Sequence, residues 1–82
     1  MVDHTALPVR VYPNPAHDKV FIEAEGIISV RLFDLLGQCL IKKKDDNNGM
    51  MEIGINNLHS SVYIIEILTE QGRVIRKLNV TR

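Results

Sequence analysis

The sequence predicts an all-β fold, a small immunoglobulin-like β-sandwich of about seven mostly antiparallel strands. Three observations lead to this prediction. Apolar and polar residues alternate with a period of two in many short segments, as they do in half-buried strands. Turn residues separate these segments about every 8–12 positions. No segment with the 3.6-residue period of an amphipathic helix is long enough to form one.

Two strands are expected on either side of a rigid turn near the start of the chain. Residues 8–12 and 19–24 both alternate in this way. Between them lie Pro13, Asn14 and Pro15, and each proline removes a backbone donor and favours an extended conformation in the residue before it. The first strand is therefore expected to end in a turn of fixed shape.

Three further strands are expected in the middle of the chain. Residues 28–34 follow a turn at Gly26, and residues 38–43 follow a tight connection in which Gly37 supplies a positive φ. Residues 50–55 follow a polar loop that ends in an Asn-Gly turn signal.

The last two strands form the clearest hairpin of the sequence. Residues 61–69 and 73–80 alternate on either side of a short turn, where Gly72 can adopt the positive φ that such a turn demands. Only Arg76 interrupts the apolar face of the second strand. At the edge of a sheet, this strand would offer unpaired backbone groups to a receptor.

Alternation also predicts which residues share the apolar face of each strand. In chain order these are Val9 and Val11; Val20, Ile22 and Ala24; Ile28, Val30 and Leu32; Cys39 and Ile41; Met51, Ile53 and Ile55; Tyr63, Ile65 and Ile67; and Val74, Leu78 and Val80. Cys39 is the only cysteine, so no disulfide can form within the chain. Its apolar neighbours predict a small filler residue in a strand.

The composition is that of an ordinary globular domain, and it narrows the range of partners. A formal net charge of zero argues against a general nucleic-acid or membrane-surface partner. No apolar run approaches the ~20 residues of a membrane helix, so no direct membrane insertion is expected. The charge is uneven only at the end, where Arg73, Arg76, Lys77 and Arg82 meet no acidic residue. This basic strand is either a charged edge that resists pairing with other chains or a tail that a receptor recognises.

No group of residues predicts catalysis. His4, His17 and His59 lie far apart in the sequence, without the spacing of a metal site. Nucleophile motifs and glycine-rich phosphate loops are missing from the sequence. We therefore expect a domain that is not an enzyme and that holds no metal or cofactor.

Four segments of the chain resemble a known family. They are VYPNPA at residues 11–16, the stretch 28–38 that ends in Leu-Gly-Gln, LHSSVYII at residues 58–65, and Gln-Gly-Arg at residues 71–73 followed by the basic strand. In this order they closely resemble the C-terminal sorting domain, type A of the Por secretion system, of type IX secretion proteins in Bacteroidetes. The resemblance covers residues 8–82 and makes residues 1–7 a linker or lead-in. Two positions depart from the family pattern: Ser61 replaces the usual glycine, and His59 replaces a common proline.

The resemblance implies that the domain is an address for a larger attached protein. In that family, the domain directs its cargo from the periplasm through the outer-membrane type IX translocon. A shuttle protein then presents the cargo to a cell-surface sortase, which usually removes the domain. The residues carried over as recognition elements for translocon and sortase are Pro13, Asn14, Pro15, Gly37, Leu58, Ser61, Tyr63, Gly72, Lys77 and Arg82.

Two other functions fit the same expected fold. An immunoglobulin-like structural or adhesive module would support a larger surface protein. A small carbohydrate-binding sandwich would depend on the aromatic rings of Tyr12 or Phe33. In either case, exposed strand edges would allow a homodimer to form by strand exchange.

Overall fold

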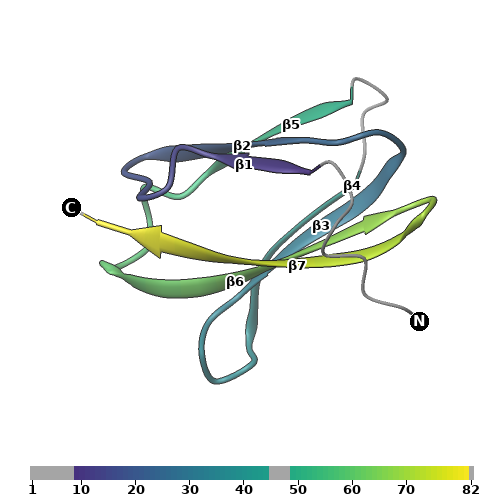
Figure 1. The fold of residues 1–82 in the computed structure, drawn as a ribbon. Coiled ribbons are helices and arrows are strands. Elements are labelled where there is room, and N and C mark those ends of the chain that lie inside the picture. The colour runs from purple at the N-terminus through teal and green to yellow at the C-terminus, as the bar shows by residue number, and fades with distance from the viewer. Residues whose placement is uncertain (1–8, 45–48, 82) are drawn as a thin grey trace.

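The computed structural model describes residues 9–44 and 49–81, which form two packed sheets. The strands are β1 (Arg10–Tyr12), β2 (Lys19–Glu23), β3 (Ile27–Phe33), β4 (Cys39–Lys44), β5 (Met50–Gly54), β6 (Ser61–Thr69) and β7 (Gly72–Val80). One sheet has the order β1-β2-β5 and the other β4-β3-β6-β7, and all paired strands are antiparallel. The three-stranded sheet lies over the four-stranded one as a second layer (Figure 1). The predicted all-β sandwich is confirmed.

The predicted strands agree with the observed ones to within two residues at every described end. The linker expected at residues 1–7 lies outside the described residues, as do Pro8, residues 45–48 of the polar loop, and Arg82.

The core lies between the two layers and consists of the apolar faces of the strands. Most of the predicted inward residues are buried: Val20, Ile22, Ala24, Val30, Leu32, Met51, Ile53, Ile55, Tyr63, Ile65, Ile67, Val74, Leu78 and Val80. Val9, Val11 and Ile41 are partly buried and pack against this core. Burying one aliphatic side chain of this size contributes about 1.5–3 kcal/mol, so the alternating residues are the main source of stability.

The face predicted for the start of β3 is wrong. Ile27 is 3% exposed and Ile28 is 46% exposed, the reverse of the prediction. The pairing of β3 with β6 shifts register between Ile27 and Ser29. Such an irregularity changes the phase of the alternation, so Ile27 faces the core in place of Ile28.

The role predicted for Cys39 is also wrong, because its side chain is exposed. A second register shift lies between β3 and β4, where Leu32 pairs with Ile41 and Phe33 pairs with Cys39. β4 is an edge strand, and most of its residues are exposed. Cys39 therefore fills no space in the core, and its Sγ lies 3.5 Å from the carbonyl oxygen of Ile41.

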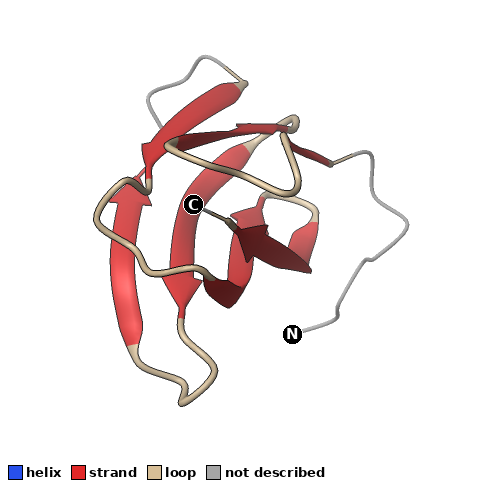
Figure 2. Ribbon diagram, turned by 90° about the vertical axis from the view of Figure 1, so that its left-hand side faces the viewer, coloured by secondary structure: helices blue, strands red, loops and turns tan. Residues whose placement is uncertain are grey.

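Two hairpins define the ends of the four-stranded sheet. The β6–β7 pairing runs from Ser61 opposite Val80 to Thr69 opposite Gly72, as the sequence predicts. The β3–β4 hairpin extends beyond the rest of the sandwich in both views (Figure 1, Figure 2).

Candidate recognition surface

One end of the sandwich brings together segments that are far apart in the sequence. Ser61 at the start of β6 pairs with Val80 at the end of β7. On its other side, Val80 forms a parallel bridge with Ala16, which follows the Pro-Asn-Pro turn. Phe33 at the end of β3 pairs with Ile64, so the β3–β4 hairpin begins beside the same end of β6.

Residues 14–16, which we call the clasp, cover the outer edge of the last strand. The Asn14 side chain donates to the carbonyl oxygen of Lys77 at 3.1 Å and accepts from the backbone N–H of Asn79 at 3.0 Å. The Ala16 N–H donates to the carbonyl oxygen of Asn79 at 2.8 Å, and the Thr81 N–H donates to the Ala16 carbonyl at 2.9 Å. The expectation that this edge is open to a receptor is therefore wrong between Lys77 and Thr81.

The turn that carries the clasp is exposed. Pro13, Asn14 and Pro15 all face solvent, and the peptide bonds before both prolines are cis. His17, just after the clasp, has its Nδ1 3.1 Å from the Thr81 hydroxyl. The predicted turn is confirmed, and its contacts tie it to the end of β7.

The β3–β4 turn is held by one carboxylate. Asp34 Oδ1 accepts hydrogen bonds from the backbone N–H groups of Leu36 and Gln38, both at 2.9 Å. The Gly37 N–H donates to the Asp34 carbonyl, and Gly37 has the predicted positive φ, here 88°. This ordered turn presents Leu35 and Leu36, which are 65% and 93% exposed.

The sequence alone did not single out Asp34 as the residue that stabilises this turn. The sequence could have indicated this role, because Asp34 lies three positions before Gly37. That spacing is typical of turns that an Asx side chain stabilises.

The loop before β6 is supported from inside the core. Tyr63 is only 4% exposed, and its hydroxyl donates to the carbonyl oxygen of His59 at 2.9 Å. Leu58 is half-buried and packs against the core, whereas Ser61 is exposed. Tyr63 therefore positions the loop, and Ser61 lies on its surface.

A hollow of about 590 Å³ lies between this loop and the β3–β4 hairpin. Its lining consists of Asp34, Leu35, Leu36, Leu40, residues 57–61 and Tyr63. Apolar side chains supply much of this lining. The hollow can therefore receive an apolar side chain of a partner.

Most of the predicted recognition residues lie at this end. They are Pro13, Asn14, Pro15, Gly37, Leu58, Ser61, Tyr63 and Lys77. Gly72 does not join them, because it lies in the turn at the opposite end of β6 and β7, where its φ is 138°. Arg82 lies outside the described residues.

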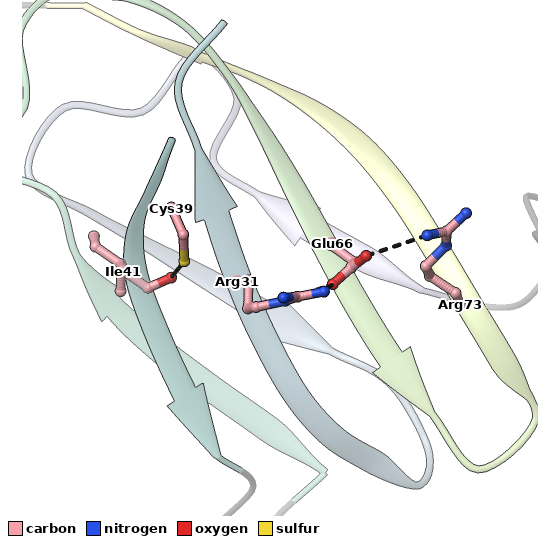
Figure 3. A network of polar contacts seen from close by, with 5 residues as sticks. All are labelled: Arg31, Cys39, Ile41, Glu66 and Arg73. Carbon is pink, nitrogen blue, oxygen red and sulfur yellow. Dashed lines mark hydrogen bonds and ion pairs between the residues drawn. The ribbon is translucent and has the colours of Figure 1, made fainter. Parts of the chain in front are cut away.

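The outer face of the four-stranded sheet carries an ion network that the sequence analysis also missed (Figure 3). Arg31 on β3 donates from both Nε and Nη2 to Glu66 Oε1 on β6, the Nε contact being 2.7 Å. Arg73 on β7 reaches Glu66 Oε2 at 3.4 Å. The Glu66 side chain is 12% exposed, so two guanidinium groups largely enclose one carboxylate.

The aromatic residues do not form a common stacking surface. The Tyr12 ring stacks on Phe21 within the three-stranded sheet, with centroids 5.7 Å apart. Phe33 lies in the other sheet, where the Arg31 guanidinium is 5.2 Å from its centroid. Tyr12 and Phe33 therefore cannot bind the same sugar or base.

Neither a metal site nor a membrane-spanning helix is found in the part of the chain that the structure describes. Within residues 9–44 and 49–81, no three His, Cys, Asp or Glu side chains are grouped so that they could hold an ion. The same residues contain no helix with the length and apolarity needed to cross a membrane.

Comparison with known proteins identifies the family. The model of a family described as the secretion system C-terminal sorting domain matches residues 10–81. The chain belongs to this family. The sorting domain is also similar to the ulvan lyase NLR42 of Nonlabens ulvanivorans, with 31% identity over 68 residues. That match covers 80% of the sorting domain but only 13% of the relative.

Membership in the family confirms the resemblance and the role of the domain as a sorting signal. The sorting domain is a C-terminal signal of type IX secretion, which acts with the type IX machinery in export to the cell surface or the medium. A sorting signal of this kind is not itself catalytic. No solved structure matches the sorting domain.

Proposed function

We propose that the sorting domain occupies residues 8–82 and guides a larger attached protein from the periplasm into the type IX translocon. An outer-membrane shuttle protein then receives it, and a sortase at the cell surface recognises it and removes it. Cleavage falls in the linker before Pro8 or upstream of residue 1. In this proposal the domain acts as a signal and not as an enzyme.

We further propose that the machinery reads the end of the sandwich that carries the clasp, the β3–β4 hairpin and the loop at residues 57–61. The observation that supports this most directly is the position of Val80, which pairs with Ser61 on one side and bridges Ala16 on the other. Three of the segments that characterise the family thus lie side by side in one surface.

The exposed members of this surface are the candidates for direct contact. Pro13, Pro15, Gly37, Ser61 and Lys77 are all exposed. In contrast, Tyr63 is buried and Asn14 is bonded to β7, so these two act by holding the surface in shape.

A fused reporter protein tests the proposed function. Removal of residues 78–82 is expected to trap the reporter in the periplasm, but it also removes the buried Leu78 and Val80. A sharper variant changes only exposed side chains, Leu36→Asp with Ser61→Lys, and its control changes the exposed Gln71 to lysine at the opposite end of the sheet.

We expect the control fusion to reach the surface and the Leu36→Asp, Ser61→Lys fusion to remain in the periplasm. Both purified variant domains should unfold at the same denaturant concentration as the wild-type domain. Normal export of the double variant would contradict the proposed surface. Failure of the wild-type fusion to leave the periplasm would contradict the function itself.

A homodimer through strand edges is a separate proposal, and the structure limits how it could form. The clasp covers the outer edge of the chain from Lys77 on β7 to Thr81 just after it. Two copies would therefore have to pair through β1, β4, β5 or the first half of β7. Sedimentation of the domain at rising concentration tests whether such a dimer forms.

A further inference from the structure

We propose that the outer face of the four-stranded sheet docks onto an acidic surface with an apolar centre on a protein of the export machinery. This inference rests on the proposed function, because the partner is sought within the same machinery. The face is distinct from the hollow at the end of the sandwich.

The charges of this neutral chain are divided unequally between its two sheets. Among residues 9–44 and 49–81, the strands of the four-stranded sheet carry seven cationic residues, which are Arg31, Lys42, Lys43, Lys44, Arg73, Arg76 and Lys77. The carboxylate of Glu66 is the single acidic group in these strands.

The strands of the three-stranded sheet are balanced by comparison. Arg10 is paired with Glu23 at 3.1 Å, and Lys19 is paired with Glu52 at 3.7 Å. Among the strand residues that the structure describes, the excess of positive charge therefore lies in the four-stranded sheet.

Strand register gathers several of these cations on one face. Val30 and Leu32 point into the core, so Arg31 between them points outward. Arg31 pairs with Lys42 on β4 and with Glu66 on β6. Neighbouring strands lie about 4.8 Å apart, so these side chains form a row across the sheet.

Two more rows extend the basic face. Lys44 pairs with Ser29 on β3, and Leu68 on β6 pairs with Arg73 on β7. Lys77 on β7 pairs with Ile64 on β6. The cations thus reach from one edge of the sheet to the other.

The ion network fixes the centre of the face in place. Glu66 binds Arg31 and Arg73 from opposite sides, and its own side chain is almost covered (Figure 3). One negative charge is therefore enclosed between two positive ones, which leaves the group net positive. Arginines held in this way lose less side-chain freedom when they bind a carboxylate.

Apolar side chains occupy the space between the cations. Phe33, Val62, Ile64, Leu68 and Ile75 alternate with buried residues, and each is half-buried. An apolar centre with arginines and a charged rim is typical of protein interfaces. A partner with carboxylates around an apolar patch would match both features and would be steered to the face by charge.

The geometry favours a protein over a membrane as the partner. Apart from Ile28 at the start of β3, the apolar residues of the face are half-buried between long cationic side chains, so they present no continuous apolar surface for a bilayer. The cations stand at fixed register positions, which suits carboxylates at fixed positions better than mobile headgroups. The most exposed leucines, Leu35 and Leu36, belong to the β3–β4 turn and not to this face.

The test compares two pairs of charge reversals in a reporter fused to the sorting domain. K42E/K44E changes the basic face without touching the end of the sandwich, and R10E/K19E changes the balanced sheet by the same net charge. We expect the first pair to lower surface display of the reporter at least tenfold and the second to lower it less than twofold. The milder K42Q/K44Q is expected to give an intermediate loss, and it replaces the reversal if the reversal does not fold.

Three further measurements make the outcome decisive. The purified variants should unfold within about 2 °C of the wild type, since all the altered side chains of the basic face are exposed. A photocrosslinking residue at position 29 should join the wild-type domain to a machinery protein, and K42E/K44E should abolish that product. Flotation with phosphatidylcholine vesicles containing phosphatidylglycerol should show no binding by the wild type.

Equal display of the two charge-reversed fusions would overturn the proposal. It would also be overturned if the wild type floated with the anionic vesicles and K42E/K44E did not. Failure of the wild-type fusion to be exported would instead overturn the proposed function. The two failures are therefore distinguishable.

Discussion

The side chain of Asn14 donates a hydrogen bond to the backbone carbonyl of Lys77, a residue 63 positions later in the chain. The same side chain accepts from the next outward-facing N–H of β7, that of Asn79. One amide group therefore takes the place of a neighbouring strand for two backbone groups of β7, and the Ala16 backbone bonds to the next ones.

Replacing Asn14 by alanine should expose this edge. We expect a loss of about 1 kcal/mol in the free energy of unfolding, because two hydrogen bonds at a solvent-exposed site are removed. Urea denaturation measures the loss, and hydrogen exchange should show faster exchange of the Asn79 amide. Asn56→Ala in an exposed loop is the control and should leave both quantities unchanged. Unchanged exchange at Asn79 in Asn14→Ala would contradict the role assigned to the clasp.

The backbone conformation of Gly37 can be tested by comparison with Gly54, which does not have a positive φ. A methyl group at Gly37 or at Gly54 would meet no atom within 4 Å, but only Gly37 has a positive φ. Gly37→Ala should therefore cost about 1 kcal/mol through backbone strain, whereas Gly54→Ala should be neutral or slightly stabilising. Thermal unfolding of both variants measures the difference. Equal stabilities would show that the β3–β4 turn tolerates another backbone conformation.

The carboxylate of Asp34 should be replaceable by an amide. Asp34→Asn keeps an oxygen that can accept from Leu36 and Gln38, so we expect little change in stability. Asp34→Ala removes both hydrogen bonds and should cost about 1 kcal/mol while it loosens the turn. Backbone NMR relaxation of Leu35 and Leu36 is the measurement. Equal mobility in the two variants would mean that Asp34 does not hold the turn.

The hydroxyl of Tyr63 should stabilise the loop before β6. Tyr63→Phe keeps the buried ring but removes the hydrogen bond to the carbonyl oxygen of His59, at an expected cost of about 1 kcal/mol. Tyr12→Phe is the matched control, since its ring keeps the stack on Phe21. Chemical denaturation of both variants compares them. If Tyr12→Phe lowered the free energy of unfolding as much as Tyr63→Phe, this would contradict a specific stabilising role for the Tyr63 hydroxyl.

The ion network should show coupling that salt weakens. A double-mutant cycle with Arg31→Ala and Glu66→Ala is expected to give an interaction energy of about 1 kcal/mol, because the Arg31 side chain is 42% exposed and solvent screens the pair. Repeating the cycle in high salt should reduce this value. The Arg10 and Glu23 pair, which is more exposed, should give a smaller energy. A larger value for that pair would contradict this account.

The strands and turns could be predicted because each depends on local pattern. Period-two alternation locates β2, β5, β6 and β7 with their buried faces, and Gly37 and Gly72 take the positive φ values that their turns require. The irregularities of β3 could not be predicted in this way. Ile27 and Ile28 have the same side chain, so hydrophobicity cannot choose between them, and the choice depends on the pairing with β6.

The proposed recognition surface could be predicted only as a set of segments. The family resemblance pointed to the Pro-Asn-Pro turn, the loop before Tyr63 and the last strand, but their contacts depend on long-range pairing that no local pattern encodes. The Glu66 network is a further example, because its two arginines lie 35 positions before and 7 positions after the carboxylate. Tyr63 was predicted as a recognition residue, but it is buried, so it supports the proposed surface from within the core.

The exposed thiol of Cys39 is a native site for chemical labelling. It is the single cysteine of the sequence and lies on an edge strand. A maleimide that cannot cross membranes would modify this thiol only in copies that have emerged from the cell envelope. In a fusion to a reporter without cysteines, the arrival of the domain on the outside could then be timed by gel shift.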